Sequence, residues 1–225
     1  MLEFSEAGID FGMRRILRDV TVEMAPGSFH FLTGPSGSGK TTFLRMCTGF
    51  LLPSAGAVQI FGRDSRGLTQ NEMAAMRRRV GIVRQEADFL PHLTLAENIL
   101  LPVRLSQRSI KASVEDMYDL LGWVGLTEQA DAYPAEVSGG EMARAALARA
   151  IIADPEMIVA DEPTGNVDSE MAEKLIRLMV QLNKMGKTFV VATHDMNMVR
   201  MVKPMTKTRV LRIRNKMLEV AGADL

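Results

Sequence analysis

Residues 34–42 read Gly34-Pro35-Ser36-Gly37-Ser38-Gly39-Lys40-Thr41-Thr42. They match the pattern G-x-x-x-x-G-K-[ST], and they stand between an apolar run expected to form a strand (29–32) and a helix-compatible segment (43–46). The glycines let the backbone fold around an anion, and the start of the following helix carries partial positive charge. We expect all of these residues to bind nucleotide phosphates, with Lys40 at the β- and γ-phosphates and the Thr41 hydroxyl on Mg²⁺. The alternative is a glycine- and serine-rich loop that ends in Lys-Thr by chance.

The composition is ordinary for a folded protein. Among 225 residues, 27 lysines and arginines balance 27 aspartates and glutamates, so the charge gives no reason to expect nucleic acid as the main partner. Cys47 is the single cysteine, which excludes an intramolecular disulfide and fits a reducing compartment. No apolar run approaches the roughly 20 residues of a membrane-spanning helix, and the acidic N-terminal segment lacks the pattern of a signal peptide. We expect a cytoplasmic protein that is soluble by itself.

The order of apolar runs and helical patterns predicts an α/β fold. The runs at 157–160 and 189–193 are continuous, as in strands that are buried on both faces. Between about 86 and 134 the patterns are helical and strand signals are almost absent, which indicates a helical insertion. The other expected strands are 2–9, 20–24, 57–61 and 80–83, with a closing hairpin at 208–213 and 217–220. The other expected helices are 71–79, 95–105, 110–124, 127–132, 141–153, 169–185 and 196–202.

Two carboxylates follow the apolar strand at 157–160, namely Asp161 and Glu162. The carboxyl end of such a strand lies at the ligand edge of a parallel sheet. Asp161 can hold Mg²⁺ through its water shell, and Glu162 can polarise the water that attacks the γ-phosphate. A solvated strand end would explain either acid singly. Both together, in a chain that also has the loop at 34–42, favour the functional interpretation.

A second anion site is predicted at Ser138-Gly139-Gly140-Glu141. Ser-Gly-Gly alone is a common helix cap, in which the serine hydroxyl satisfies free backbone amides. A helix N-terminus with glycines can also bind an anion. Two such helix ends in one chain suggest a nucleotide that is clamped from two sides.

In this order, the motifs resemble the ATPase subunits of the ATP-binding-cassette family, and the resemblance covers nearly the whole chain. It implies one domain over 1–225, an α/β fold of the P-loop NTPase type. A RecA-like core with an antiparallel β subdomain is implied for 1–85 and 157–225, and a helical signature subdomain for about 86–156. It also implies that two copies bind two ATP molecules head to tail. The motif at 138–141 of one copy then serves the nucleotide of the other.

The resemblance also implies roles for single residues. Gln85 matches the glutamine that joins Mg²⁺ and relays to the helical lobe, and His194 matches the switch histidine that contacts the γ-phosphate and orients the water. Asp168 lies in the loop that crosses the dimer interface. Phe11 stands where an adenine-stacking aromatic is expected, with a core position as the alternative. The implied catalytic residues are Glu162, His194, Lys40 and Gln85, and the implied metal ligands are Thr41, Gln85 and Asp161.

The amino-acid sequence at 31–37, 90–94, 161–166 and 192–195 resembles that of the cell-division ATPases of this family. That resemblance implies a subunit on the cytoplasmic face of the inner membrane that regulates peptidoglycan hydrolysis through an integral membrane permease, docked near 86–101. Lipoprotein-release and macrolide-export ATPases share much of this sequence and have the same architecture, so they are the alternatives within the family. A cassette ATPase acting on DNA or ribosomes, and a nucleotide-binding scaffold with negligible turnover, are the alternatives of another class.

Overall fold

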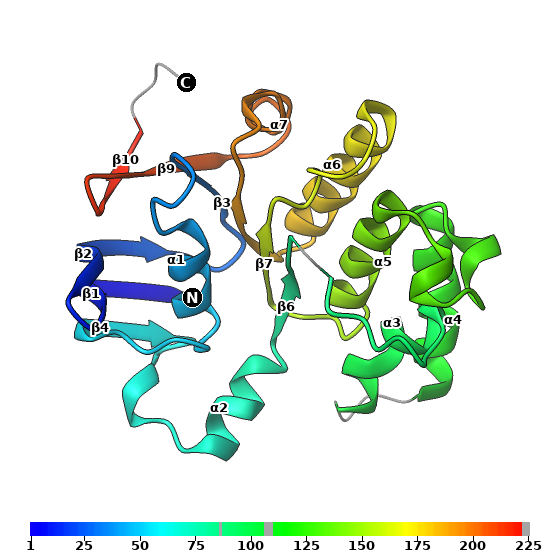
Figure 1. Ribbon diagram of the computed structural model, residues 1–225, viewed down its shortest axis with the longest axis horizontal. Helices are drawn as coiled ribbons and strands as arrows, with labels where there is room; N and C mark the ends of the chain where they lie inside the picture. The colour runs from blue at the N-terminus through cyan, green and yellow to red at the C-terminus, as the bar shows by residue number, and fades with distance from the viewer. Residues whose placement is uncertain (86, 106–109, 222–225) are drawn as a thin grey trace.

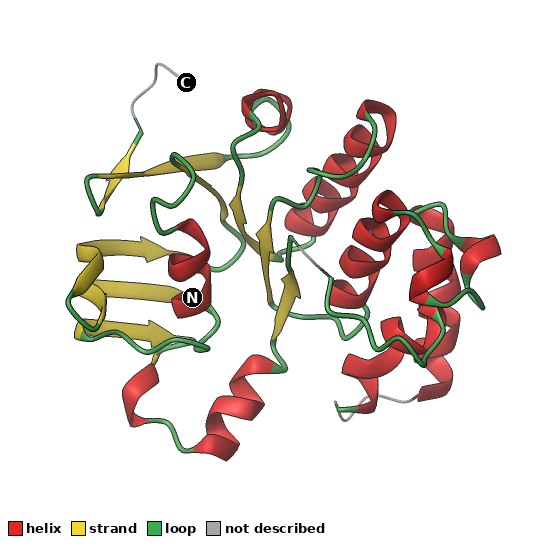
Figure 2. Cartoon of the chain, in the orientation of Figure 1, coloured by secondary structure: helices red, strands yellow, loops and turns green. Residues whose placement is uncertain are grey.

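The computed structural model describes residues 1–85, 87–105 and 110–221. Its strands form two sheets, and helices lie along and beyond the second sheet (Figure 1). Figure 2 shows that the strands are concentrated on one side of the molecule and the long helices on the other. None of the helices in these residues is both long enough and apolar enough to cross a membrane.

The first sheet is antiparallel, with the order β2-β1-β4-β5. Its strands are β1 (Leu2–Phe11), β2 (Arg14–Met24), β4 (Ala55–Ile60) and β5 (Arg63–Asp64). Side chains two residues apart are buried, such as Leu2 and Phe4, because one face of the sheet covers the interior. On this face Phe4 stacks on Phe43 of helix α1 (Lys40–Cys47), with ring centroids 4.8 Å apart. The sheet therefore supports the helix that follows the phosphate loop (residues 34–42).

The second sheet has the order β10-β9-β3-β8-β7-β6 and is parallel except for β10. Its strands are β3 (Phe29–Thr33), β6 (Val80–Val83), β7 (Met157–Asp161), β8 (Thr188–Ala192), β9 (Thr208–Arg214) and β10 (Met217–Val220). Every residue of β3, β7 and β8 is buried, as their apolar sequences predict. The carboxyl ends of these strands meet at one edge, which brings the phosphate loop close to the two acids at the end of β7, Asp161 and Glu162.

The remaining helices are α2 (Gln70–Arg77), α3 (Leu95–Arg104), α4 (Ile110–Trp123), α5 (Gly139–Ile151), α6 (Ser169–Lys184) and α7 (Met196–Val202). In Figure 1, α3, α4 and α5 gather beyond β6, on the side away from the antiparallel sheet. The described residues between 87 and 156 contain helices and no strand. The boundaries of a helical subdomain at about 86 and 156 stay a prediction.

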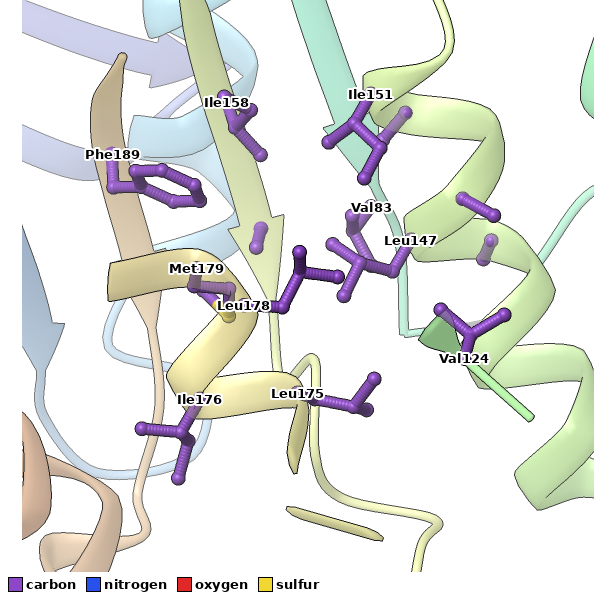
Figure 3. Close-up of a cluster of buried hydrophobic side chains, with 14 of the residues drawn as sticks. Val83, Val124, Leu147, Ile151, Ile158, Leu175, Ile176, Leu178, Met179 and Phe189 are labelled. Carbon is purple, nitrogen blue, oxygen red and sulfur yellow. The ribbon is translucent and has the colours of Figure 1, made fainter. Parts of the chain in front are cut away.

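One buried cluster joins α5 and α6 to the parallel sheet (Figure 3). Leu147 of α5 lies beside Val83 of β6, and Leu178 of α6 lies near them. The closest approach is at Gly81 of β6, where a Cβ would lie 2.1 Å from the carbonyl oxygen of Ala150. Only glycine fits there, so β6 and the C-terminal part of α5 are in direct backbone contact.

Most predicted elements are confirmed, and the differences have local causes. Strand β2 begins at Arg14 instead of 20, because its pairing with β1 continues to the hairpin turn. Exposed charged residues on its outer face hide that extension in the sequence. The segment 127–132 contains only the 3₁₀ turn Thr127–Gln129, so a helix there was wrong. Strand β5 has two residues and is too short to give a pattern.

A buried histidine lies within the parallel sheet. The His30 side chain is 3% exposed, and its Nε2 lies 2.7 Å from Ser28 Oγ. The Ser28 hydroxyl donates to the carbonyl oxygen of Ala25, so Nε2–H must be the donor to Ser28. Among the described residues His30 Nδ1 has no hydrogen-bond partner. Burial, and secondly the charge of Arg209, lower the pKa of His30 to about 4.

We expect the free energy of unfolding to fall as the pH drops from 6.5 towards 4. Unfolded His30 takes up a proton in this window and the folded state resists it, so the unfolded state binds more protons. The stabilisation is complete above pH 6.5, and about 3 kcal/mol is lost by pH 4. Urea unfolding between pH 6.5 and 4 should show a smaller loss of the free energy of unfolding in His30→Gln than in the wild type. The control His92→Gln, at an exposed loop position, should lose as much as the wild type. The same change of the free energy of unfolding with pH in all three proteins would contradict this explanation.

Candidate nucleotide site

A cavity of about 760 Å³ opens at the carboxyl edge of the parallel sheet. It is lined by Phe11, Arg14, Ile16, Gly34, Pro35, Ser36, Gly37, Gly39, Lys40, Thr41, Thr42, Gln85, Asp161, Glu162 and His194. These residues come from the β1–β2 hairpin, the phosphate loop and the ends of β6, β7 and β8. Segments far apart in the chain therefore converge on one space, whose volume lies within the roughly 300–1,000 Å³ of ligand sites.

The phosphate loop wraps around the amino group of Lys40. Lys40 Nζ donates to the carbonyl oxygens of Gly34, at 2.8 Å, and Pro35, at 3.2 Å. Gly39 has φ 107°, and a Cβ on Gly34 would lie 2.8 Å from Ser38 Oγ, so both positions require glycine. Helix α1 begins at Lys40 itself. A lysine charge and a helix N-terminus therefore face the same cavity, an arrangement that favours phosphate.

Thr41 and Asp161 meet on one wall of this cavity. Thr41 Oγ1 donates to Asp161 Oδ2 at 2.7 Å. Burial raises the pKa of Asp161 and the neighbouring Glu162 adds to this, whereas the Thr41 bond and the charge of Lys40 oppose it. Hydroxyl and carboxylate oxygens are ligands that Mg²⁺ prefers, so the pair fits a magnesium site. The described residues contain no cluster of three or more His, Cys, Asp and Glu side chains that could hold a metal.

Glu162 is held in a fixed orientation at the end of β7. Its backbone has φ 50°, in the left-handed region, and its N–H donates to the carbonyl oxygen of Ala192 at 2.9 Å. Its carboxylate accepts from Thr193 Oγ1 at 3.0 Å, from the His194 N–H at 3.0 Å and from His194 Nδ1 at 2.7 Å. The His194 side chain is 76% exposed against 11% for Glu162. The carboxylate is therefore anchored while the imidazole reaches into the cavity.

The motif at 138–141 lies outside this cavity, at the start of α5. Ser138 Oγ accepts from the Glu141 N–H at 3.2 Å, and the Glu141 carboxylate accepts from the Ser138 N–H and hydroxyl, both at 2.7 Å. This capping box lowers the pKa of Glu141. Gly139 begins the helix, and a Cβ on Gly140 would lie 3.0 Å from the carbonyl oxygen of Asn166. The helix end thus packs against the loop after β7.

Asp168, at the end of that loop, is also a helix cap. Its Oδ1 accepts from the Met171 N–H at 2.9 Å at the start of α6, and this bond is the main cause of its lowered pKa. Asp168 does not line the cavity. The chain therefore brings the phosphate loop and the residues at the strand ends together, but not the residues at 138–141 and 168.

The structure shows where three further residues named from the sequence lie relative to the cavity. Phe11 lines the cavity and is 49% exposed, so it is not a core residue, and its stacking on adenine stays a prediction. Ser38 does not line the cavity, since its Oγ is buried below the loop without a partner among the described residues. Gln85 lines the cavity from the end of β6.

The sequence interpretation missed Arg14, Ile16 and Thr193. Arg14 and Ile16 line the cavity because the β1–β2 hairpin folds back towards the phosphate loop. Thr193 binds the Glu162 carboxylate and accepts from the Asp195 N–H at 3.0 Å. A polar residue between a fully apolar strand and His194 is a signal that could have identified it.

The model of the ABC transporter family matches residues 17–165, from β2 through the phosphate loop and the 138–141 motif to the acid pair. The chain belongs to the ABC transporter family. It is an ATP-binding-cassette ATPase, and its α/β fold is the fold of these cassettes. It is 31% identical to the ATP-binding cassette MJ0796, whose structure is a post-hydrolysis dimer bound to ADP and Pi. The two superpose with a TM-score of 0.88 over 97% of each chain.

Curated relatives of this ABC ATPase include several subfamilies. It is 37% identical to the cell division ATP-binding protein FtsE of Escherichia coli K12 over 84% of the chain and 85% of that protein. It is 39% identical to the ABC transporter ATP-binding protein YtrE of Bacillus subtilis over 80% of the chain and 79% of that protein. It is 38% identical to the lipoprotein-releasing system ATP-binding protein LolD 1 of Rhodopirellula baltica over 81% of both. These values are too similar to choose a subfamily.

Proposed function

We propose that this ABC ATPase uses ATP with Mg²⁺, dimerises on ATP and drives an inner-membrane partner in bacterial cell division, in the manner of FtsE. The observation that carries the hydrolytic part is the Glu162–His194 pair. Its carboxylate is fixed by three donors at the cavity that also holds Lys40. Water can be activated there beside the group that binds the phosphates.

In the proposed mechanism, Glu162 accepts a hydrogen bond from the water that attacks the γ-phosphate in line. Lys40 and the backbone amides of the phosphate loop stabilise the charge that develops on the phosphate oxygens. Thr41, Asp161 and Gln85 would hold Mg²⁺, and the bound ion would neutralise charge on the phosphates.

His194 has a constrained protonation in this arrangement. Its Nδ1 faces the Glu162 carboxylate at 2.7 Å, so Nδ1 must carry the proton that is donated there. Its Nε2 is left free to face the nucleotide. We propose that this bond fixes the imidazole ring, so that His194 orients the γ-phosphate and Glu162 together.

Dimerisation supplies the rest of the site. Ser138, Gly139, Gly140, Glu141 and Asp168 lie outside the cavity of their own chain, and we propose that they complete the site of a second copy. The N-terminus of α5 would then face the γ-phosphate of the partner's nucleotide. The related cassette MJ0796 is dimeric in both of its structures, which supports dimerisation of this chain.

The membrane partner is proposed from the relatives. The identity to FtsE favours an FtsX-like permease, docked near 86–101, and a peripheral position on the cytoplasmic face of the inner membrane. The second candidate is lipoprotein release, because the identity to LolD 1 is as high. In either case, closure of the dimer on ATP and its release after hydrolysis are the mechanical output.

Co-expression with each candidate permease tests this choice. The chain is co-purified with FtsX or with a lipoprotein-release permease from the same genome, and ATP hydrolysis is measured in lipid nanodiscs. We expect FtsX alone to co-purify and to raise hydrolysis by several-fold. Stimulation by the export permease and not by FtsX would overturn the division role, and the Glu162→Gln chain in the same nanodiscs gives the background.

A further inference from the structure

One end of the nucleotide cavity is formed by the β1–β2 hairpin, which contributes Phe11, Arg14 and Ile16 to the lining. Ile16 touches the phosphate loop, since a Cβ on Gly39 would lie 3.1 Å from its Cγ2. Arg14 lies two residues before Ile16, and Phe11 pairs directly with Arg14 across the hairpin. At about 3.3 Å per residue, Arg14 and Phe11 stand about 7 Å along the hairpin from the contact with the loop. We call this the base end of the cavity, because a nucleotide with its phosphates in the loop would place its base there.

Arg14 brings a positive charge to the base end. Its side chain is exposed and has no hydrogen-bond or ion-pair partner among the described residues. Asp10, the acid that precedes Phe11, pairs with Arg15 at 3.1 Å instead. Arg15 does not line the cavity, as expected for neighbours on a strand, whose side chains point to opposite faces. One arginine of the hairpin is therefore neutralised away from the cavity, and Arg14 is available to a ligand inside it.

A guanidinium can donate hydrogen bonds but cannot accept them, so Arg14 can discriminate between bases. Guanine presents two acceptors, N7 and O6, on one edge, and their spacing matches the fork of an arginine. Adenine presents N7 beside an amino group, which is itself a donor and cannot pair with a second N–H. Phe11 and Ile16, the other two residues that the hairpin contributes, are apolar and offer no side-chain acceptor to that amino group. The base end can therefore satisfy guanine better than adenine.

We propose that Arg14 determines the base specificity of this site. Its guanidinium binds N7 and O6 of a guanine at the base end, so that GTP is a substrate of this ATPase beside ATP and is bound more tightly. Guanine has the flat surface that stacking on Phe11 requires, so the exchange of base loses no contact with the ring. The hydrolytic step is unchanged, because water attacks the same γ-phosphate and GDP and phosphate leave. The inference rests on the proposed position of the base at Phe11 and adds the residue that selects the base.

Isothermal titration calorimetry with nucleoside diphosphates tests this preference without hydrolysis and without dimerisation on ATP. We expect GDP to bind at least about tenfold more tightly than ADP, which is within the range for a bidentate pair with a base. IDP keeps N7 and O6 but lacks the 2-amino group, so it should bind like GDP. Arg14→Gln should reverse the order, because an amide donates to N7 and accepts from the adenine amino group. Arg18→Gln, the same change at an exposed position of β2 outside the cavity, should keep the preference for GDP.

Several results would overturn the proposal. Equal affinity for GDP and ADP, tighter binding of ADP, or a preference for GDP that survives in Arg14→Gln would each do so. A similar loss of affinity for both diphosphates in Arg14→Gln would assign Arg14 to the phosphates and would also end its role in base selection. Circular dichroism and thermal unfolding show whether each variant is folded. Binding of both diphosphates without preference removes the base specificity alone, whereas the absence of any binding would remove the proposed nucleotide site as well.

Discussion

Glu162→Gln should reduce steady-state ATP hydrolysis by roughly 10²–10⁴-fold, the range for loss of a general base. The amide keeps the shape of the side chain but cannot accept a proton from water. It also exchanges a charged acceptor for a neutral one opposite His194, so the hydrogen bond at 2.7 Å that holds the imidazole becomes weaker. Phosphate release measured at saturating ATP checks the rate.

The same variant should keep its affinity for ATP, because the phosphate loop and Thr41 are untouched. Since hydrolysis opens the dimer in the proposed cycle, Glu162→Gln should accumulate as an ATP-bound dimer in size-exclusion chromatography. Glu173→Gln is the matched control, as Glu173 lies on α6 and pairs with Arg177 away from the cavity. If Glu162→Gln hydrolysed ATP as fast as Glu173→Gln, Glu162 would not be the general base.

Mixing two inactive variants should restore about a quarter of the wild-type activity. Lys40→Ala damages the phosphate loop, and Ser138→Arg damages the motif proposed to serve the second copy. Half of random dimers combine the two variants, and in a head-to-tail dimer both lesions then fall in one of the two sites. The other site is intact. Hydrolysis measured over a range of mixing ratios should peak at the equal mixture.

The control mixture joins Lys40→Ala with Glu162→Gln. Both residues line the cavity of their own chain, so each site of the mixed dimer carries one lesion and no activity should return. Equal behaviour of the two mixtures would contradict the shared site. Activity that returns only in the mixture of Lys40→Ala with Ser138→Arg would show that Ser138 acts at the site of the partner copy.

The parts of the site that depend on short-range order could be predicted from the sequence. The loop at 34–42 needs glycine at defined positions and a strand and helix around it, and all of these are local. The two acids at the end of β7 follow in the same way from one buried strand. Local order and chemistry together predict where a phosphate and a metal would be held.

The parts that depend on packing between distant segments could not be predicted. The sequence marks Thr193 as a polar residue after an apolar strand, but it does not show that Glu162 is its partner, because the pairing of β8 with β7 is not contained in the chain order. Arg14 enters the cavity because the β1–β2 hairpin continues past the apolar part of β2. A cavity of about 620 Å³ is likewise assembled from α2, β6, α3 and α5, and its four arginines, Arg77, Arg78, Arg84 and Arg149, look singly like ordinary surface charges.

The backbone contact between Gly81 and Ala150 fixes the C-terminal part of α5 against β6, so a tilt of the helix would move its N-terminal end. Ser138 is at one end, and the pivot is near the other, where Ala150 touches β6 and Arg149 holds the segment that follows Gln85. The arm from 150 to 138 is about 18 Å long at 1.5 Å per residue. A rotation of about 10° at the pivot therefore displaces the serine by about 3 Å, the length of one hydrogen bond. In the proposed head-to-tail dimer, small movements beside Gln85 would thus be enough to bring the serine to a phosphate on the other copy or to withdraw it.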